Sequence, residues 1–270
     1  MRDVKAVQVS QYRRDAVVKV YVGASLHKDT VAKRGEVTEF SARSRGRLLF
    51  AAFNASVDWI AFAVLTYPSE FPSDGRKVKD HIYLLCKWVT RSFDGKVLWG
   101  LEFQERGAPH INLLCDVPIP KDLLSQRWFE IVGSGDERHL RAGTRIEWCR
   151  SSGEAAGYMA AAYSAKKSAQ KTVPPGFEHV GRFWGVSRGL VVPVQEQVYT
   201  IDEGLTKIRA LRKFTEKQIK PRRCQPMTEE KLRVRKVKRR PKLQHLHAGL
   251  CGFKSFGGAS VACRLIGSDS

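Results

Sequence analysis

The stretch LWGLEFQERGAPHINLLCDVP, residues 98–118, decides the fold. Residues 106–108 (Arg-Gly-Ala) favour a turn, so strands at 97–104 and 109–115 are expected to pair as an antiparallel hairpin. Side chains alternate between the two faces of a strand. One face of this hairpin then carries apolar side chains, namely Leu101, Phe103, Ile111 and Leu113. The other face carries polar side chains, namely Glu102, Gln104, His110 and Asn112.

The polar face of the hairpin offers a carboxylate, an imidazole and two amides. Opposed side chains in a hairpin lie about 5 Å apart at Cβ, which is close enough for several of them to hold one cation. Oxygen and imidazole donors suit Mg²⁺ or Mn²⁺ better than a metal that prefers thiolates. The alternative is an ordinary wet sheet surface, and the hairpin alone does not decide between the two.

A second candidate element is the alanine-rich segment 153–171, which predicts a helix. In it, Lys166 follows Tyr163 by three residues, so the two side chains lie one turn apart on nearly the same face. A tyrosine that is helped to lose its proton can attack phosphorus, and a lysine can neutralise the phosphate charge. The alternative is that Tyr158 and Tyr163 pack against the sheet while Lys166 and Lys167 are solvated.

The remaining pattern predicts the fold class. Strands are expected at residues 16–22 and 58–67, and a helix at 78–89, where apolar residues recur at helical spacing. Strands and helices alternate without a regular βαβ rhythm. We therefore expect an α+β fold, in which an antiparallel sheet has helices packed on one face and its other face open.

Composition points to a polyanionic partner. The 270 residues contain 47 Lys+Arg and 27 Asp+Glu, a net charge of +20, and nucleic acid is the commonest partner of so basic a chain. The hydrophobic share of 43% excludes a wholly disordered protein. The six cysteines show no C-x-x-C pair, and the first residues are too polar for a signal peptide. A cytoplasmic protein without a membrane segment is expected.

The basic residues concentrate near the C-terminus. Residues 207–243 contain 16 Lys and Arg against three acidic residues. Residues 202–220 can form an amphipathic helix. Beyond Pro221 the pattern is typical of a solvated tail, with a defined binding element as the alternative, and either would bind phosphates without reading sequence. The expected organisation is one domain at 1–215 and a basic, flexible tail at 216–270.

Several segments, taken in order, resemble the HUH endonucleases (named for His-hydrophobe-His), in particular the rolling-circle replication initiators of single-stranded DNA phages and related plasmids. The similarity covers most of the expected domain. The segments are FSARSRGRLLFAAFN (40–54), VLTYP (64–68), LEFQERGAPHIN (101–112), YSAK (163–166) and VPPGFEHVGRFWG (173–185). They resemble, in turn, the lead-in, the first motif, the metal motif, the Y-x-x-K nucleophile motif and the segment that follows it.

The resemblance implies an HUH/RRM-like fold and a role for each residue. Glu102, His110 and Asn112 would hold Mg²⁺ or Mn²⁺. Tyr163 would be the nucleophile, with Lys166 assisting and Tyr158 in reserve. Lys167, Arg182 and Trp184 would contact DNA, although Trp184 can equally be a core residue.

The chain departs from the family pattern at two places. Asn112 stands where the family has its second histidine, and an amide oxygen is a weaker ligand than an imidazole. Tyr158 and Tyr163 are five residues apart rather than four, which turns them about 140° away from each other on a helix.

The resemblance implies a rolling-circle replication initiator, which nicks and joins single-stranded DNA at a replication origin through a covalent 5′-phosphotyrosine. A host helicase and a host polymerase would be its partners. The alternative is a non-catalytic protein that binds single-stranded nucleic acid on the same fold. A third possibility, an RNA-associated protein, rests on charge alone.

Overall fold

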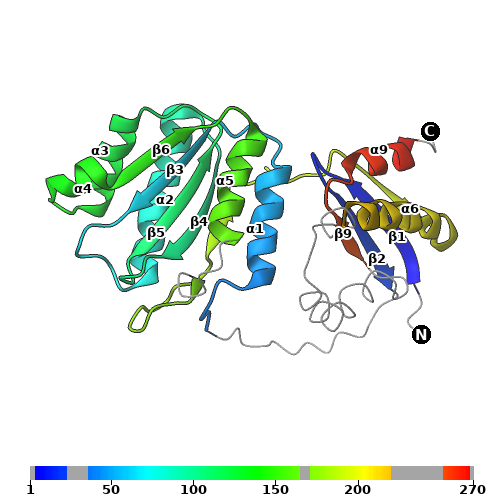
Figure 1. Cartoon of the computed structure of the whole chain (residues 1–270), viewed down its shortest axis with the longest axis horizontal. Coiled ribbons are helices and arrows are strands. Elements are labelled where there is room, and N and C mark those ends of the chain that lie inside the picture. The colour runs from blue at the N-terminus through cyan, green and yellow to red at the C-terminus, as the bar shows by residue number, and fades with distance from the viewer. Residues whose placement is uncertain (1–3, 23–35, 165–170, 220–251, 268–270) are drawn as a thin grey trace, which may run out of the picture. The chain divides into compact units, whose positions relative to one another are not determined.

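The computed structural model describes residues 4–22, 36–164, 171–219 and 252–267 (Figure 1). The chain divides into two compact units. Unit 1 combines residues 1–31 with residues 192–270, and unit 2 comprises residues 32–191. In the sequence, unit 2 is therefore inserted between the two parts of unit 1.

This division differs from the expected domain at 1–215 with a tail at 216–270. Unit 1 has a sheet of its own, built from both ends of the chain. Its strands, in spatial order, are β8 (Gln195–Tyr199), β1 (Val4–Gln11), β2 (Ala16–Val22) and β9 (Phe253–Ser255), with neighbours antiparallel. β9 and the helix α9 (Ala259–Gly267) come from the segment expected to be a tail. Residues 220–251, which hold most of the basic run, lie outside the described residues.

Two helices, α6 (Ile201–Ile219) and α9, pack on the same face of this sheet (Figure 1). The core between them contains Val7, Val9, Ala16, Val18, Tyr199, Ile208, Leu211 and Ala262. The ammonium of Lys207 donates to the Leu265 carbonyl (2.8 Å) and lies 5.1 Å from the centre of the Tyr199 ring. The first residue of the basic stretch 207–243 therefore joins the two helices of unit 1.

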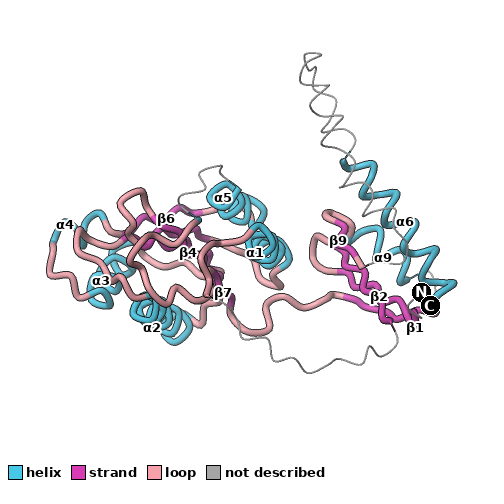
Figure 2. Tube along the Cα trace, turned by 90° about the horizontal axis from the view of Figure 1, so that it is seen from below, coloured by secondary structure: helices cyan, strands magenta, loops and turns pink. Residues whose placement is uncertain are grey.

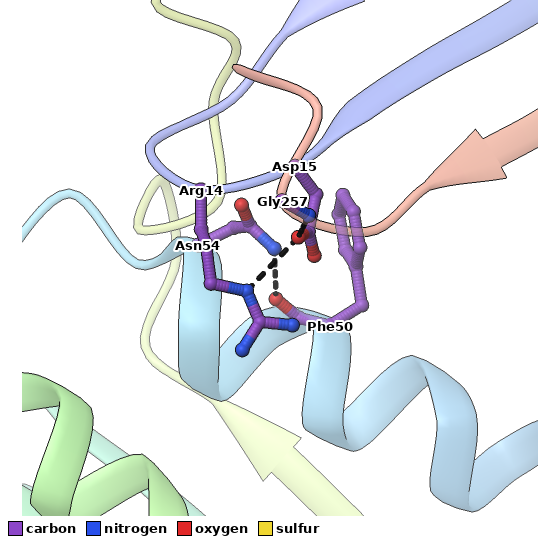
Figure 3. A network of polar contacts seen from close by, with 5 residues as sticks. All are labelled: Arg14, Asp15, Phe50, Asn54 and Gly257. Carbon is purple, nitrogen blue, oxygen red and sulfur yellow. Dashed lines mark hydrogen bonds and ion pairs between the residues drawn. The ribbon is translucent and has the colours of Figure 1, made fainter. Parts of the chain in front are cut away.

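A buried carboxylate joins the β1–β2 turn to the C-terminal segment of unit 1. Asp15 is fully buried, and its Oδ1 accepts hydrogen bonds from Arg14 Nε (2.9 Å) and from the Gly257 backbone N–H (2.8 Å) (Figure 3). Gly257 has φ +71°, a left-handed conformation that favours glycine. These bonds supply the partners that a buried carboxylate requires.

Unit 2 is built on a five-stranded antiparallel sheet. Its strands, in spatial order, are β6 (Thr144–Trp148), β3 (Ala61–Thr66), β5 (Pro109–Cys115), β4 (Val97–Phe103) and β7 (Trp184–Val186). β4 and β5 form the predicted hairpin, whose loop contains Gly107 at φ +82°. Both strands are buried along almost their whole length. The expected α+β class and antiparallel sheet are thus confirmed.

Helices cover both faces of this sheet, whereas one open face was expected. α1 (Ala42–Asn54) and α5 (Ser152–Ser164) lie on one side, and α2 (Gly75–Phe93) and α3 (Lys121–Val132) lie on the other (Figure 2). The short α4 (Glu137–Ala142) follows α3. The face that carries Glu102 and Asn112 also carries Leu98 and Leu114, both fully buried. Burial of these apolar side chains requires a cover, which the small residues of α5 provide at close range.

Local sequence explains the helices of unit 2. α2 buries the predicted stripe, Val78, Ile82, Leu85 and Val89. Asp74 caps its start by accepting from the Arg76 N–H (2.8 Å), and Asp94 ends it at φ +51°. In the last turn of α1, Asn54 Nδ2 donates to the Phe50 carbonyl (2.9 Å; Figure 3).

Within the described part of the chain, no helix is long and apolar enough to cross a membrane.

Candidate active site

The hairpin register places the predicted metal ligands together. Glu102 pairs with His110, and Gly100 pairs with Asn112, so their side chains project from the same face of the β4–β5 ribbon. Asn112 Nδ2 lies 3.4 Å from Glu102 Oε2, and His110 Nδ1 lies 3.9 Å from the same oxygen. The carboxylate is therefore the centre of the group.

α5 brings Tyr163 onto this cluster. Asn112 Nδ2 donates to Tyr163 Oη at 3.1 Å. The phenol lies directly over Gly100, where a Cβ atom would come within 2.3 Å of Oη. Phe40 packs edge-on against the tyrosine ring at 5.3 Å between centroids. Only a glycine at position 100 leaves room for the hydroxyl. The β4–β5 hairpin, α5 and the segment that contains Phe40 therefore all contribute residues to this point.

Glu102 is buried and incompletely bonded. Its side chain is 7% exposed, and its Oε1 has no hydrogen-bond partner among the described residues. Burial raises the pKa of Glu102 to about 7, while Lys171 and the bond from Asn112 act in the opposite direction. A buried carboxylate oxygen without a partner is costly unless a cation or a donor completes it.

The phenol of Tyr163 is protonated in this arrangement. It is 1% exposed, and burial followed by the charge of Glu102 raises its pKa well above the ordinary value, against the hydrogen bond from Asn112. Burial lowers the pKa of His110, which favours its neutral imidazole. His110 has a 26% exposed side chain, which makes it the most accessible member of the cluster.

The donor set fits a hard divalent cation. Glu102 Oε1 is unpartnered, His110 offers a neutral ring nitrogen, and Asn112 offers an amide oxygen. Asn112 now directs its amide nitrogen toward Glu102 and Tyr163, so binding a cation through the amide oxygen requires the amide to rotate. The described residues contain no group of three His, Cys, Asp or Glu side chains that could hold a metal.

The two tyrosines diverge, as the five-residue spacing predicts. Tyr158 is 37% exposed, stacks on Phe62 at 5.7 Å, and lies 3.5 Å from Glu154 Oε1. The negative charge of Glu154 raises the pKa of the Tyr158 phenol. Tyr163, not Tyr158, therefore contacts the Asn112–Glu102 pair.

Lys166 and Lys167 lie outside the described residues, so their predicted roles stay predictions. Lys171, the last residue of the segment expected to be helical, acts on the cluster electrostatically. Lys171 is buried, and its charge lowers the pKa of Glu102. Burial and then the nearby Arg45 lower the pKa of Lys171 itself. The Phe40 N–H donates to the Lys171 carbonyl (2.7 Å), a contact between distant segments that the sequence pattern does not mark.

The other residues predicted for the site lie in different places. The Gln104 side chain accepts from Arg106 Nε (2.9 Å) in the hairpin loop. Trp184 pairs with Gly100 and so shares the face of the cluster, and its indole N–H donates to Ser44 Oγ on α1 (3.2 Å). Arg182 instead lines a pocket on the α2 side of the sheet. Trp184 and Arg182, two of the three predicted DNA contacts, are thus on opposite faces.

Comparison with protein-family models, with curated proteins and with solved structures found no match to this chain. The function proposed below therefore rests on the geometry of the chain itself.

Proposed function

We propose that unit 2 is a metal-dependent nuclease of the HUH type, which nicks and rejoins single-stranded DNA through a phosphotyrosine at Tyr163. The observation that carries the proposal is the 3.1 Å contact between Tyr163 Oη and Asn112. Asn112 also adjoins Glu102, whose Oε1 has no hydrogen-bond partner among the described residues. A nucleophile, a cation site and a basic chain of charge +20 are the parts that such a reaction needs.

Attack by Tyr163 forms a bond between Oη and phosphorus and breaks the bond between phosphorus and the departing 3′ oxygen. The phenolic proton ends on that 3′ oxygen, which leaves a free 3′ hydroxyl and a 5′-phosphotyrosine. Because the new ester retains the energy of the old one, a 3′ hydroxyl can reverse the step and join two strands without ATP.

The residues of the cluster have separate roles in this proposal. Glu102, His110 and Asn112 would hold Mg²⁺ or Mn²⁺, which would polarise the scissile phosphate. Without a metal, Asn112 donates to the Tyr163 phenol, and its amide would rotate when it holds the ion. Lys171 adds positive charge beside Glu102. Because the Tyr163 hydroxyl is buried, α5 must move away from the sheet before a phosphate can reach it.

The biological role that we propose is initiation of rolling-circle replication at a DNA origin in the cytoplasm of a bacterial host. Unwinding and synthesis would then depend on a host helicase and a host polymerase. The sequence has no G-x-x-x-x-G-K-[ST] motif of its own to bind the phosphates of a nucleotide for a helicase.

The test is covalent capture of DNA. The full chain is incubated with random-sequence single strands labelled at the 3′ end, with and without Mn²⁺, and run on a denaturing gel. Labelled protein is expected only with Mn²⁺, is expected to vanish in Tyr163→Phe, and is expected to persist in the matched control Tyr158→Phe. Labelled protein that persists in Tyr163→Phe, or that never forms with wild type, contradicts the proposal.

One observation favours a second candidate, a binder of single-stranded nucleic acid that no longer cleaves. Tyr163 is buried, and burial together with the charge of Glu102 keeps its phenol protonated, an arrangement that holds the nucleophile inactive. Asn112→His separates the two functions, because it restores an imidazole at the metal site. Adducts that form only in Asn112→His would establish the binder, whereas adducts of equal yield in both proteins would establish the nuclease.

A further inference from the structure

A pocket of about 370 Å³ lies on the other face of the same sheet, between α2 and the β4–β7 strands of unit 2. The residues that matter for its chemistry are Lys79, Tyr83, Trp99, Arg182 and Gly185. The nine residues that line it include no aspartate or glutamate. The pocket is therefore positively charged, and nothing in the candidate active site uses it.

Lys79 carries a buried ammonium in this pocket. Its Nζ is inaccessible to solvent and has no hydrogen-bond partner among the described residues. It lies 5.2 Å from the centre of the Trp99 ring, a cation–π contact. Burial, and then the charge of Arg182, lowers the pKa of Lys79 to about 8. Among the described residues, this ammonium lacks the anion that a buried charge normally pairs with.

Aromatic rings form the rest of the recognition surface. Trp99 is partly buried at the pocket wall, and Tyr83 is 61% exposed with Lys87 Nζ 5.6 Å from its ring centre. Gly185 pairs with Trp99, and a Cβ at position 185 would come within 2.7 Å of the indole nitrogen. The absence of a side chain at Gly185 thus lets the indole lie flat against β7.

We propose that this pocket binds a nucleotide, with the phosphate on Lys79 and Arg182 and the base against Trp99 and Tyr83. Cationic side chains bind phosphate through charge-assisted hydrogen bonds, and aromatic rings stack on any base. The nucleotide can be a free monophosphate or one residue of a DNA single strand, since both present the same chemistry. The site lies on the face opposite Tyr163 and does not depend on the proposed nuclease activity.

Calorimetric titration of the full chain tests the proposal with three probes: inorganic phosphate, thymidine monophosphate and an eight-residue oligothymidylate. Lys79→Met keeps the length of the side chain and removes its charge, and Lys77→Met is the matched control, an exposed lysine on the same helix. We expect Lys79→Met to weaken nucleotide or oligonucleotide binding about tenfold or more, and Lys77→Met to weaken it about twofold or less. Inorganic phosphate should bind more weakly than either.

The probes also identify the source of the nucleotide. Binding of the monophosphate indicates a free nucleotide, and binding of the oligonucleotide alone indicates a strand. Equal losses in Lys79→Met and Lys77→Met would overturn the proposal, and phosphate binding as tight as the nucleotides would overturn the role of the rings.

Discussion

On each face of the sheet at β4, one ionisable side chain has a buried polar atom, and the two side chains have opposite charge. On the α5 side, Glu102 has a buried oxygen without a partner, and on the α2 side, Lys79 has a buried nitrogen without one, among the described residues. Burial shifts both pKa values toward neutrality, to about 7 for Glu102 and about 8 for Lys79. The sheet separates the two groups, so they cannot neutralise each other. Each face is therefore suited to a ligand of the opposite charge, a metal cation on one side and a phosphate on the other.

The two faces also differ in how tightly side chains pack against them. Replacing one glycine on each face by alanine measures that difference. Gly100→Ala would place Cβ 2.3 Å from Tyr163 Oη, whereas Gly185→Ala would place it 2.7 Å from Trp99 Nε1. Tyr163 is held on all sides, while Trp99 borders a pocket and can shift. We expect Gly100→Ala to destabilise unit 2 by about 2–3 kcal/mol and Gly185→Ala by about 1 kcal/mol.

Denaturant unfolding followed by tryptophan fluorescence checks both values. Gly46→Ala on α1 is the control, because a Cβ there meets no atom within 4 Å and the helix gains a better former. If Gly100→Ala lowered the free energy of unfolding no more than Gly185→Ala, the α5 face would not be the more tightly packed one.

Removing the charge of Lys79 should stabilise the protein. In the unfolded chain its pKa is near 10.5, and in the fold it is about 8. Below pH 8 Lys79 is protonated in both the folded and the unfolded state, so the folded state carries the full free-energy cost of burying the ammonium. Between pH 8 and 10.5 the unfolded state binds more protons, so stability rises with pH. Lys79→Met should therefore gain on the order of 1–3 kcal/mol at pH 7, and this gain should fade toward pH 10.5.

The difference between wild type and Lys79→Met, measured by denaturant unfolding from pH 6 to 10.5, checks this prediction. Arg182, Tyr83 and Cys86 face the same pocket and are common to both proteins. Burial raises the pKa of the Cys86 thiol to about 12, above this range. A gain that does not depend on pH would show that the ammonium is not the source of the effect.

The smallest expected effect is on the α5 face, where a metal should add stability. If Glu102 holds Mn²⁺, about 1 mM of the ion should raise the melting temperature of wild type by about 3 °C. Glu102→Gln should abolish this increase, and Glu137→Gln, an exposed carboxylate on α4, should retain it. Calorimetry in matched buffers measures the shift. An equal increase in all three proteins would indicate a metal bound elsewhere.

The sequence alone was sufficient for the hairpin and its register. Alternating polar and apolar side chains fixed which residues of β4 and β5 share a face, and the Arg-Gly-Ala turn fixed the pairing. The placement of Tyr163 near this face also followed from sequence, through the Y-x-x-K motif. The hairpin is predictable because its alternation and its turn depend on near neighbours in the chain, whereas the contact between Tyr163 and Asn112, 51 residues apart, was expected only through the motif order.

Long-range packing could not be predicted in the same way. The polar residues of β4–β5 suggested an open face, but the buried Leu98 and Leu114 on that face require α5 as a cover. Lys79 adjoins the apolar stripe of α2, and its contact with Trp99 exists only once α2 lies on the sheet. The division into two units was missed because β8 and β9, five and three residues long, are too short for a clear alternating pattern.

The most direct test of the central claim is a crystal of the full chain soaked in Mn²⁺ and measured at the manganese absorption edge. The account predicts an anomalous peak between Glu102, His110 and Asn112, at about 2.0–2.3 Å from their donor atoms, with the Asn112 amide turned to present its oxygen. Manganese bound only at other positions, with this carboxylate oxygen still unpartnered, would contradict it.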